Sequence, residues 1–590
     1  MEIAKGIPVA PGFGIGSVHI VNQEEYLIRE INLLSDEKAE REVGLFEAAL
    51  KRTRSDLSSF KRTLARRLGS EESSIFDAHL HILSDASLID KTLHLIRKEH
   101  KNAAFAFKKT VEEIIHAMQS VKDQYLRERA DDIKDVYHRV LNHLLEDFAE
   151  GAVSIATDES VILVAHSLSP YEFVHFERRK ILGIVTEIGG ETSHFSIIAR
   201  SLEIPTVVGC ENILFKVKTG DTVVVDGARG WAIINPDTAT LGKYEKQRER
   251  YFHFEQRLFA LRDLDPVTLD GKTVDIAANI ELPGELPMVL EHGCRNIGLC
   301  RTEFLYLLKN RTPTEQEQYR IYRTYLEKMH PGYVIIRTMD LGGDKIGSAS
   351  PENGQEANPA LGWRAIRICL DDEELFRTQL RAILRASVHG NCKIMFPMIS
   401  TLDELRRTLR FYRKVRSGLL NEGVEVNPEV EIGIMIEVPA AALCADQLAH
   451  EADFFSIGTN DLVQFMLAVD RGNKKISHLF DPFNPAVLKI IKHVVDAAHS
   501  RGIWTGVCGE MASHPLSALL LLGMGVDELS MNSLSVLEMK RIIRAIAFDE
   551  IRDVVEQALS LETSRKIKVF LEREFRSRVH LSPKDPLFPS

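Results

Sequence analysis

The sequence predicts a multidomain α/β protein, with a C-terminal (β/α)8 TIM barrel and an N-terminal α/β domain that carries an inserted all-helical domain. The first observation is the length of 590 residues, which is too long for one hydrophobic core and suggests about three or four domains. The second is a change to long, charged helical stretches between about Ser35 and Glu150. The third is the regular alternation of strand and helix patterns after Asp265, which is typical of α/β folds.

Short strand patterns flank the helical insertion. Residues 1–20 alternate apolar and small residues around glycines. Further strand patterns follow the insertion at 161–164, 183–187, 206–208 and 222–226. We therefore expect the first segment to join the later α/β domain.

Helical patterns define the insertion and a linker. Within the insertion, a buried helical stripe is indicated by the spacing of Val140, Leu141, Leu144 and Leu145. The charged stretch from Pro236 to Leu264 indicates a linking helix. The predicted segments are 1–30 plus 150–236 (α/β domain), 31–149 (helical insert), 237–264 (linker helix), 265–575 (barrel) and 576–590 (C-terminal tail).

The C-terminal half contains candidate strands that are nearly continuous apolar runs, as expected for parallel strands buried on both faces. They lie at 273–280, 297–304, 333–340, 393–398, 431–438, 454–459, 504–508 and 528–532. A doubly wound open sheet is the alternative to a barrel. The barrel is favoured because polar residues follow the strand ends, where barrel active sites are built. These residues are Arg301, Arg337, Glu437, Asp461 and Cys508.

Composition narrows the function classes. A net charge of −11 argues against a nucleic-acid-binding protein. No apolar run reaches the roughly 18–20 residues that a membrane span needs, and the N-terminus lacks the layout of a secretory signal. Seven cysteines without CxxC spacing indicate reduced thiols. We expect a cytoplasmic protein without membrane insertion.

One histidine stands out in the segment GGETSHFSIIARSLEIPTVVG, from Gly189 to Gly209. His194 follows two glycines and a Thr-Ser pair at the start of a predicted helix. Backbone N–H groups at a helix N-terminus attract anions, and an imidazole there can act as a nucleophile toward phosphorus. The alternative is a hydrogen-bonded histidine without a catalytic role.

Basic and acidic residues of the barrel suggest a site for an anion and a metal ion. The guanidinium groups suited to phosphate and carboxylate belong to Arg301, Arg337 and Arg471, and Lys345 and Arg364 could add positive charge. Surface ion pairs are the alternative for each arginine. Glu437 and Asp461 are either structural caps or ligands for a hard cation such as Mg²⁺. A lone cysteine such as Cys508 is more often inert than reactive.

Several long segments, together with the histidine segment, resemble enzyme I of the bacterial phosphoenolpyruvate:sugar phosphotransferase system, the phosphoenolpyruvate–protein phosphotransferases. The resemblance covers nearly the whole chain, from GIPVAPGFGIGSVHIV to the final helices. The segments are GLCRTEF (298–304), IRTMDLGGDK (336–345), NPALGWRAIR (358–367), IMFPMIS (394–400), GIMIEVPAA (433–441), FFSIGTNDLVQFMLAVDR (454–471) and TGVCGEMA (505–512).

The resemblance implies a function and a role for each matching residue. His194 would take a phosphoryl group from phosphoenolpyruvate and pass it to the phosphocarrier protein HPr, the first general step of sugar uptake. Glu437 and Asp461 would hold Mg²⁺, and Asn460 would contact the phosphate. Cys508 would protonate C3 of the enolate to give pyruvate. The family also implies a phosphohistidine domain that swivels, HPr docking on the helical insert, including 75–85 and 124–136, and a homodimer formed through the barrel.

Some positions depart from the family pattern, and other families share parts of it. Glu191 precedes the Thr-Ser-His, Phe173 stands where small hydroxyl residues are frequent, and His514 replaces an acid. Dikinase-type enzymes share the phosphohistidine and the barrel, but they need a nucleotide-binding domain that we do not find here. The nitrogen-regulatory paralogue carries an N-terminal sensory domain, whereas this chain begins at GIPVAPG. A catalytically inactive regulatory scaffold is disfavoured by the intact set of site residues.

Overall fold

The computed structural model describes residues 1–579 except 22–29, 34, 68–79, 81, 120–132, 134, 135, 138, 142, 145–159, 169–179, 190–195, 197, 198, 200–203, 282, 308–311, 343–357, 472 and 474. The chain forms two compact units, Met1–His253 and Phe254–Ser590. Among the described residues, no helix is both long and apolar enough to cross a membrane.

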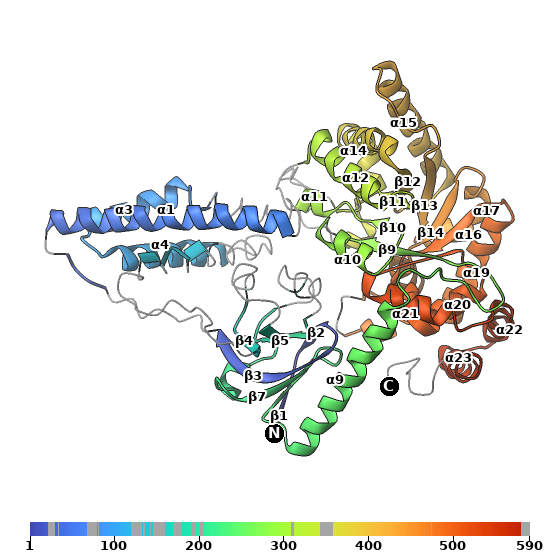
Figure 1. Cartoon of the computed structure of the whole chain (residues 1–590). Helices are drawn as coiled ribbons and strands as arrows, with labels where there is room; N and C mark the ends of the chain where they lie inside the picture. The colour runs from blue at the N-terminus through green and yellow to red at the C-terminus, as the bar shows by residue number, and fades with distance from the viewer. Residues whose placement is uncertain are drawn as a thin grey trace. The chain divides into compact units, whose positions relative to one another are not determined.

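The first unit contains a mixed eight-stranded sheet (Figure 1) with the order β1-β8-β7-β3-β4-β5-β6-β2. Its strands are β1 (Glu2–Lys5), β2 (Ile7–Ala10), β3 (Phe13–Val21), β4 (Val161–Ala165), β5 (Ile181–Thr186), β6 (Thr206–Val208), β7 (Thr222–Asp226) and β8 (Trp231–Ile234). The neighbours β3, β4, β5 and β6 run parallel, and the other neighbouring pairs are antiparallel. The strands before and after the helical segment therefore build one sheet.

Three helices between β3 and β4 pack against one another in Figure 1: α1 (Asp36–Arg67), α3 (Ala86–Lys98) and α4 (Ala103–Gln119). Asp85 begins α3 by accepting a hydrogen bond from the Ser87 N–H at 2.8 Å, as expected for an N-cap. Val140 and Leu141 are fully buried in the same hydrophobic core, as the predicted stripe requires, and Leu145 lies outside the described residues.

The unit boundary falls within one long helix, α9 (Thr238–Phe259). Its first half packs on the sheet, where Tyr244 donates a hydrogen bond to Asp226 at 3.3 Å and its ring lies 5.9 Å from that of Phe13. The short helix α8 (Ile213–Lys216) lies between β6 and β7 in the sequence.

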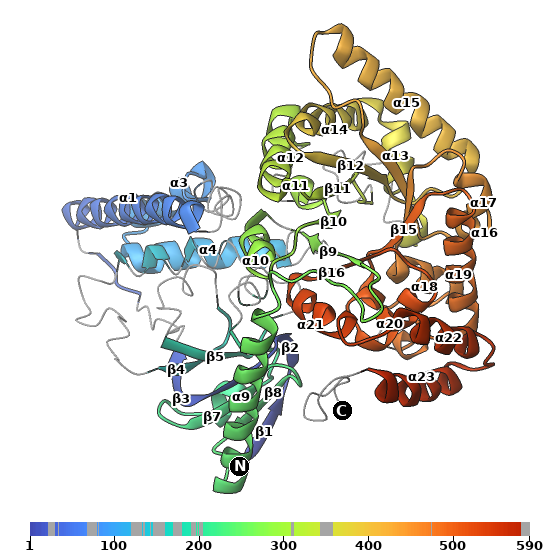
Figure 2. The ribbon, with the colours of Figure 1, turned by 45° about the vertical axis from the view of Figure 1, so that its right-hand side comes forward.

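The second unit is a closed barrel of eight parallel strands (Figure 2). They are β9 (Asp275–Ile280), β10 (Ile297–Cys300), β11 (Tyr333–Arg337), β12 (Asn391–Phe396), β13 (Glu431–Ile436), β14 (Phe454–Ile457), β15 (Trp504–Val507) and β16 (Glu528–Met531). β16 pairs with β9 from Glu528↔Asp275 to Met531↔Ala278, which closes the ring. The predicted barrel is confirmed, and the open sheet is excluded.

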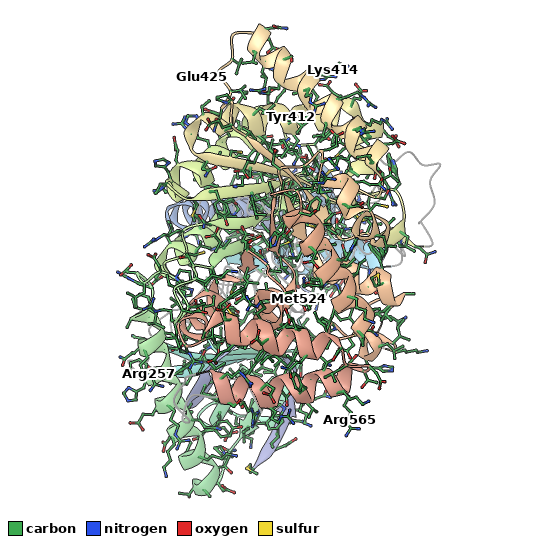
Figure 3. The ribbon with its side chains drawn as sticks, turned by 90° about the vertical axis from the view of Figure 1, so that its right-hand side faces the viewer. Arg257, Tyr412, Lys414, Glu425, Met524 and Arg565 are labelled. Carbon is green, nitrogen blue, oxygen red and sulfur yellow. The ribbon has the colours of Figure 1, made fainter. Side chains whose placement is uncertain are left out.

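Helices surround the barrel, and their buried faces form one large core with the outward-facing strand residues. Tyr412 on α15 and Met524 directly after α20, both labelled in Figure 3, belong to this core. The helices are α10 (Leu286–Glu291), α11 (Phe304–Leu307), α12 (Glu315–Met329), α13 (Ile366–Asp371), α14 (Glu373–Ala386), α15 (Leu402–Asn421), α16 (Pro439–Leu443), α17 (Ala445–Leu448), α18 (Thr459–Leu467), α19 (Pro485–His499), α20 (Pro515–Gly523), α21 (Ser533–Ile543), α22 (Phe548–Leu559) and α23 (Ser564–Arg578). Short 3₁₀ turns lie at Pro283–Glu285, Pro359–Leu361, Ser387–His389, Ser477–Leu479 and Glu510–Ala512.

The barrel interior is polar at its N-terminal end. Glu528 is buried, accepts a hydrogen bond from the Tyr333 hydroxyl, and its pKa is raised by burial to about 7. Lys393 lies over the ring of Trp504 at 4.8 Å and pairs with Glu431 at 2.6 Å. Apolar side chains follow toward the C-terminal end, including those of Leu299, Ile335, Met395 and Met435. These apolar side chains separate the charged residues at the N-terminal end of the barrel from the polar groups at the C-terminal strand ends.

Candidate active site

The C-terminal ends of neighbouring parallel strands bring polar side chains together at one mouth of the barrel. Arg337 ends β11, Glu437 follows β13, and Cys508 follows β15. Asn460 and Asp461 lie in the first turn of α18, directly after β14. Because parallel strands all end at the same rim, residues that are far apart in the sequence become neighbours there.

Arg337 is the buried basic centre of this mouth, with 8% of its surface exposed. Its Nη2 donates to Glu303 at 3.0 Å, and its Nη1 lies 3.0 Å from Asp340 and 3.7 Å from the sulfur of Met435. Burial favours the neutral guanidine, yet the carboxylates of Glu303, Asp340 and Glu437 keep the pKa of Arg337 above its ordinary value. The side chain therefore stays charged and is fixed in place.

Asp340 holds a second guanidinium beside the first. Its Oδ1 accepts from Nε and Nη2 of Arg364 at 3.0 and 2.7 Å, while its Oδ2 faces Arg337. Burial opposes ionisation of Asp340, but the two arginines outweigh it and lower its pKa. Asp340 is not among the residues predicted from the sequence. The sequence feature that could have identified it is the position of an acidic residue three places after Arg337, just past the end of a buried strand.

Two further carboxylates approach Asp340. Glu437 is 1% exposed and accepts a hydrogen bond from the Met398 N–H at 2.6 Å. Asp461 lies 3.6 Å from Nη2 of Arg364. Among the described residues, Asp340, Glu437 and Asp461 form a group whose ligand atoms all lie within 4.8 Å of one another. Burial and repulsion by the other two carboxylates raise the pKa of Glu437 to about 8, so a cation at this point would relieve a real electrostatic cost.

Arg301 also has a carboxylate partner, because its Nη1 pairs with Glu281 directly after β9. The Nε atoms of Arg301 and Arg337 are buried and have no hydrogen-bond partner among the described residues. An unpaired buried donor is costly, and a bound anion would satisfy it.

Asn460 and Arg471, which were also predicted, both bond to the exposed carboxylate of Glu510. Its Oε1 accepts from Nη1 of Arg471 at 3.2 Å and from Nδ2 of Asn460 at 3.3 Å. The Glu510 N–H donates to Oδ1 of Asn460 at 3.0 Å. Arg471 is thereby linked through Glu510 to Asn460 in the first turn of α18.

Cys508 is buried, with 4% of its surface exposed, and its sulfur lies 3.9 Å from the Ile457 carbonyl oxygen. Burial raises the pKa of this thiol to about 11, so the group carries its proton at neutral pH. The next residue must be small, because a Cβ atom at Gly509 would lie 2.0 Å from Oγ1 of Thr459. The end of β15 is therefore packed directly against the start of α18.

Some predicted residues lie outside the described part of the chain. These are His194, Lys345, Glu191 and Phe173, together with parts of the segments 75–85 and 124–136. His514 is described and lies directly before α20.

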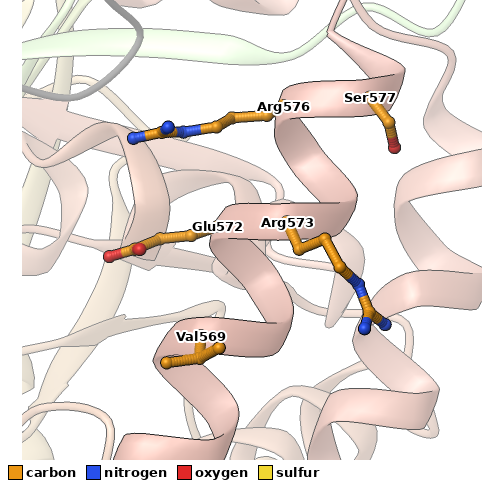
Figure 4. A pocket seen from close by; sticks show the side chains of 5 residues that line it. All are labelled: Val569, Glu572, Arg573, Arg576 and Ser577. Carbon is orange, nitrogen blue, oxygen red and sulfur yellow. The ribbon is translucent and has the colours of Figure 1, made fainter.

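A depression of about 540 Å³ on α23 is a weaker candidate site (Figure 4). Its lining residues all come from this one helix, and they are Val569, Glu572, Arg573, Arg576 and Ser577. In Figure 4, the side chains of Glu572 and Arg576 extend to one side of the helix and those of Arg573 and Ser577 to the other. Side chains that diverge in this way do not build a shared binding site.

Comparison with known proteins assigns the barrel and the N-terminal segments to described protein families. The family model described as PEP-utilising enzyme, PEP-binding domain, matches residues 255–548. Those described as PEP-utilising enzyme, N-terminal, and PEP-utilising enzyme, mobile domain, match residues 5–129 and 157–230. The barrel with its cluster thus lies within the segment that matches the PEP-binding domain.

Curated relatives match over almost the whole chain, and each is named phosphoenolpyruvate-protein phosphotransferase. The protein from Staphylococcus carnosus is 42% identical over 572 residues, which are 96% of this chain and 98% of the relative. Those from Bacillus sp. and Geobacillus stearothermophilus are each 42% identical over 570 residues, 97% of this chain and 98% of the relative. The chain therefore belongs to the family of phosphoenolpyruvate-protein phosphotransferases.

Proposed function

We propose that this protein transfers the phosphoryl group of phosphoenolpyruvate to its own His194 and then to the phosphocarrier protein HPr, and that it releases pyruvate. The observation that carries the proposal is the buried ion-pair cluster at the barrel mouth, where Asp340 holds Arg337 and Arg364 side by side. Phosphoenolpyruvate has a phosphate and a carboxylate on one small skeleton, and paired guanidinium groups suit both.

The substrate-binding groups in this proposal are Arg301, Arg337, Arg364, Asn460, Arg471 and Lys345. Each described arginine among them has a carboxylate partner that holds its planar fork in place. A guanidinium has five N–H donors, so donors remain for a substrate. Prearranged positive charge of this kind is the main contribution that proteins make to phosphoryl transfer.

Glu437 and Asp461 are the proposed ligands of Mg²⁺. Carboxylate oxygens are the ligands that this ion prefers. Burial, together with repulsion by Asp340 and Asp461, raises the pKa of Glu437, and a bound cation would favour its ionised form. Both oxygens of Asp340 already face arginines, so we assign Asp340 to positioning those arginines. When bound, the ion would neutralise charge on the transferring group.

The chemical steps use the side chains of His194 and Cys508. The His194 imidazole attacks phosphorus as the bond from phosphorus to the enol oxygen breaks, which leaves a phosphohistidine and the enolate of pyruvate. The Cys508 S–H bond then breaks as a C3–H bond forms, the enolate oxygen becomes the ketone oxygen, and the thiolate regains a proton from solvent. A pKa of about 11 makes Cys508 a donor that stays loaded at neutral pH.

The wider arrangement is part of the same proposal. The segments predicted from the sequence act as a swivelling phosphohistidine domain, a helical HPr-binding insert and a barrel that forms a cytoplasmic homodimer. A histidine that collects phosphate in one place and delivers it in another must move between them, as gating domains do in other multi-step enzymes. The family match over nearly the full chain supports this arrangement.

Incubation with ³²P-labelled phosphoenolpyruvate and Mg²⁺, followed by purified HPr, tests the proposal. The wild type should gain acid-labile label and pass it to HPr. His194→Ala should gain none, whereas His253→Ala, which changes an exposed histidine of α9, should behave as wild type. Labelling of His194→Ala would refute the assignment, and labelling from γ-³²P-ATP would favour a dikinase instead.

A further inference from the structure

Asn279, near the end of β9, contacts the main chain of Cys508 inside the barrel. Its Nδ2 donates to the Cys508 carbonyl oxygen at 3.0 Å, and its Oδ1 accepts from the Ser530 hydroxyl at 2.6 Å. We propose that Asn279 is a positioning residue that fixes the direction of the Cys508 thiol, and that Ser530 fixes Asn279. The inference rests on the proposed function, in which Cys508 delivers a proton to C3 of the enolate.

The orientation of the Asn279 amide is dictated by its two neighbours. A carbonyl oxygen can only accept a hydrogen bond, so the NH₂ group must face Cys508. The amide oxygen then faces Ser530, whose hydroxyl must donate. The donors and acceptors therefore have only one arrangement: Ser530 donates to Asn279, and Asn279 donates to the Cys508 carbonyl. Each residue fixes the orientation of the next.

Cys508 needs such support because it lies just beyond the strand ladder. β15 pairs with β16 only at Gly506 and Val507, so the Cys508 carbonyl lies past the last paired residue. Its N–H does bond to Ile457 of β14 at 3.2 Å. Asn279 lies on β9, beyond β16 in the barrel, and reaches the carbonyl across the interior. The residue that bears the thiol is thus held from both sides.

Placement matters for a proton donor more than for a packing residue. A catalytic group displaced by about 1 Å can lose roughly 100-fold in rate. The simpler alternative is that Asn279 only satisfies a buried carbonyl. That role would affect stability but would not single out the protonation step.

The test measures phosphoryl transfer and protonation separately in Asn279→Ala and Ser530→Ala. Substrate carrying one deuterium at a single defined position on C3 (the Z isomer), reacted in tritiated water, gives pyruvate with a chiral methyl group only if protonation occurs on one face, on the enzyme. Single-turnover labelling gives the rate of phosphorylation of His194. The matched control is Asn296→Ala, because Asn296 accepts a hydrogen bond from the Tyr333 N–H at 3.2 Å at the other end of the barrel.

We expect Asn279→Ala to phosphorylate His194 within about threefold of the wild-type rate and to lose at least about tenfold in stereospecific protonation. Ser530→Ala should show a smaller loss of the same kind, and it serves as the test if Asn279→Ala does not fold. Asn296→Ala should retain both steps. Normal chirality and rate in Asn279→Ala would overturn the inference, as would equal losses in phosphorylation and protonation in that variant.

A Cys508→Ala arm separates failure of this inference from failure of the proposed function. If Cys508→Ala still yields a chiral methyl group, the thiol is not the acid, and both the proposed role of Cys508 and the role of Asn279 are refuted, whereas transfer to His194 is judged by the labelling alone. If Cys508→Ala loses chirality while Asn279→Ala keeps it, only the role of Asn279 is refuted.

Discussion

Arg337 and Asp340 form a buried ion pair at the end of β11, with 3.0 Å between Nη1 and Oδ2 and with side chains that are 10% and 3% exposed. The other oxygen of Asp340 binds Arg364. One carboxylate therefore sets the spacing of two guanidinium groups. The proposed binding of an anion at the barrel mouth depends on this acidic residue.

Asp340→Asn should weaken substrate binding because an amide has one acceptor oxygen and cannot hold both arginines. We expect the KM for phosphoenolpyruvate to rise more than about tenfold, and the free energy of unfolding to fall by about 3 kcal/mol because a buried pair is broken. Steady-state kinetics and urea unfolding measure the two effects. Glu422→Gln, which removes the carboxylate partner of Arg381 on the surface, is the control. An unchanged KM in Asp340→Asn would show that the arginines are positioned by other groups.

Glu437→Gln should act on the metal rather than on the arginines. Loss of a carboxylate ligand should weaken Mg²⁺ binding at least as much as loss of a residue that supports a ligand, about 10–100-fold. Calorimetric titration with Mg²⁺ gives the affinity. Asp340→Asn is the matched comparison and should stay within a few fold of wild type, since both its oxygens face arginines. Equal losses in the two variants would make Asp340 a third ligand.

Glu528 should make the stability of the barrel depend on pH. Burial raises its pKa from about 4.5 to about 7 in the folded state. Between these values the folded chain holds a proton that the unfolded chain has lost, so the free energy of unfolding falls as pH rises through this window. The advantage of Glu528→Gln over wild type should grow by about 3 kcal/mol from pH 4.5 to 7 and then level off. Urea unfolding at several pH values measures it.

Tyr333→Phe gives a second check on the sign of this effect. The Tyr333 hydroxyl bonds to the Glu528 carboxyl and lowers its pKa. Its removal should extend the window in which stability falls to higher pH. A shift toward lower pH would contradict the account.

The seven thiols should differ sharply in reactivity. Cys444 is exposed and the other six are buried, and burial raises the pKa of Cys508 to about 11, which leaves little thiolate to react. Iodoacetamide at pH 8 should therefore modify one thiol per chain quickly, with little loss of activity. Cys444→Ser should abolish the fast phase, as followed by mass spectrometry. Rapid inactivation of Cys444→Ser would mean that Cys508 is accessible.

The barrel could be predicted from the sequence because its strands are apolar on both faces, so each appears as a continuous run with a definite end. Those ends located Arg337, Glu437 and Asp461. The partners of these residues could not be found in the same way. Glu281 and Glu303 pair with arginines at the ends of neighbouring strands in the closed barrel. Residue spacing within one segment does not predict a contact between two strands.

The inward-facing charges at the lower end of the barrel were missed for another reason. Lys393 and Glu528 are the first residues of the candidate strands at 393–398 and 528–532, and a charged residue at the start of a strand is equally typical of an exposed loop end. Glu431 pairs with Lys393, and the Tyr333 hydroxyl donates to one of the two carboxylate oxygens of Glu528. These partners offset part of the cost of burial, and they come from other strands of the assembled barrel.

The close contact between Gly509 and Thr459 couples the position of Cys508 to the position of Asp461. A methyl group at position 509 would force the turn after Cys508 away from the helix start that bears Asp461. Cys508, the proposed proton donor, and Asp461, the proposed metal ligand, would then be displaced together. A substitution at position 509 that is selected for its effect on one proposed step would also alter the other, because both steps depend on glycine at this position.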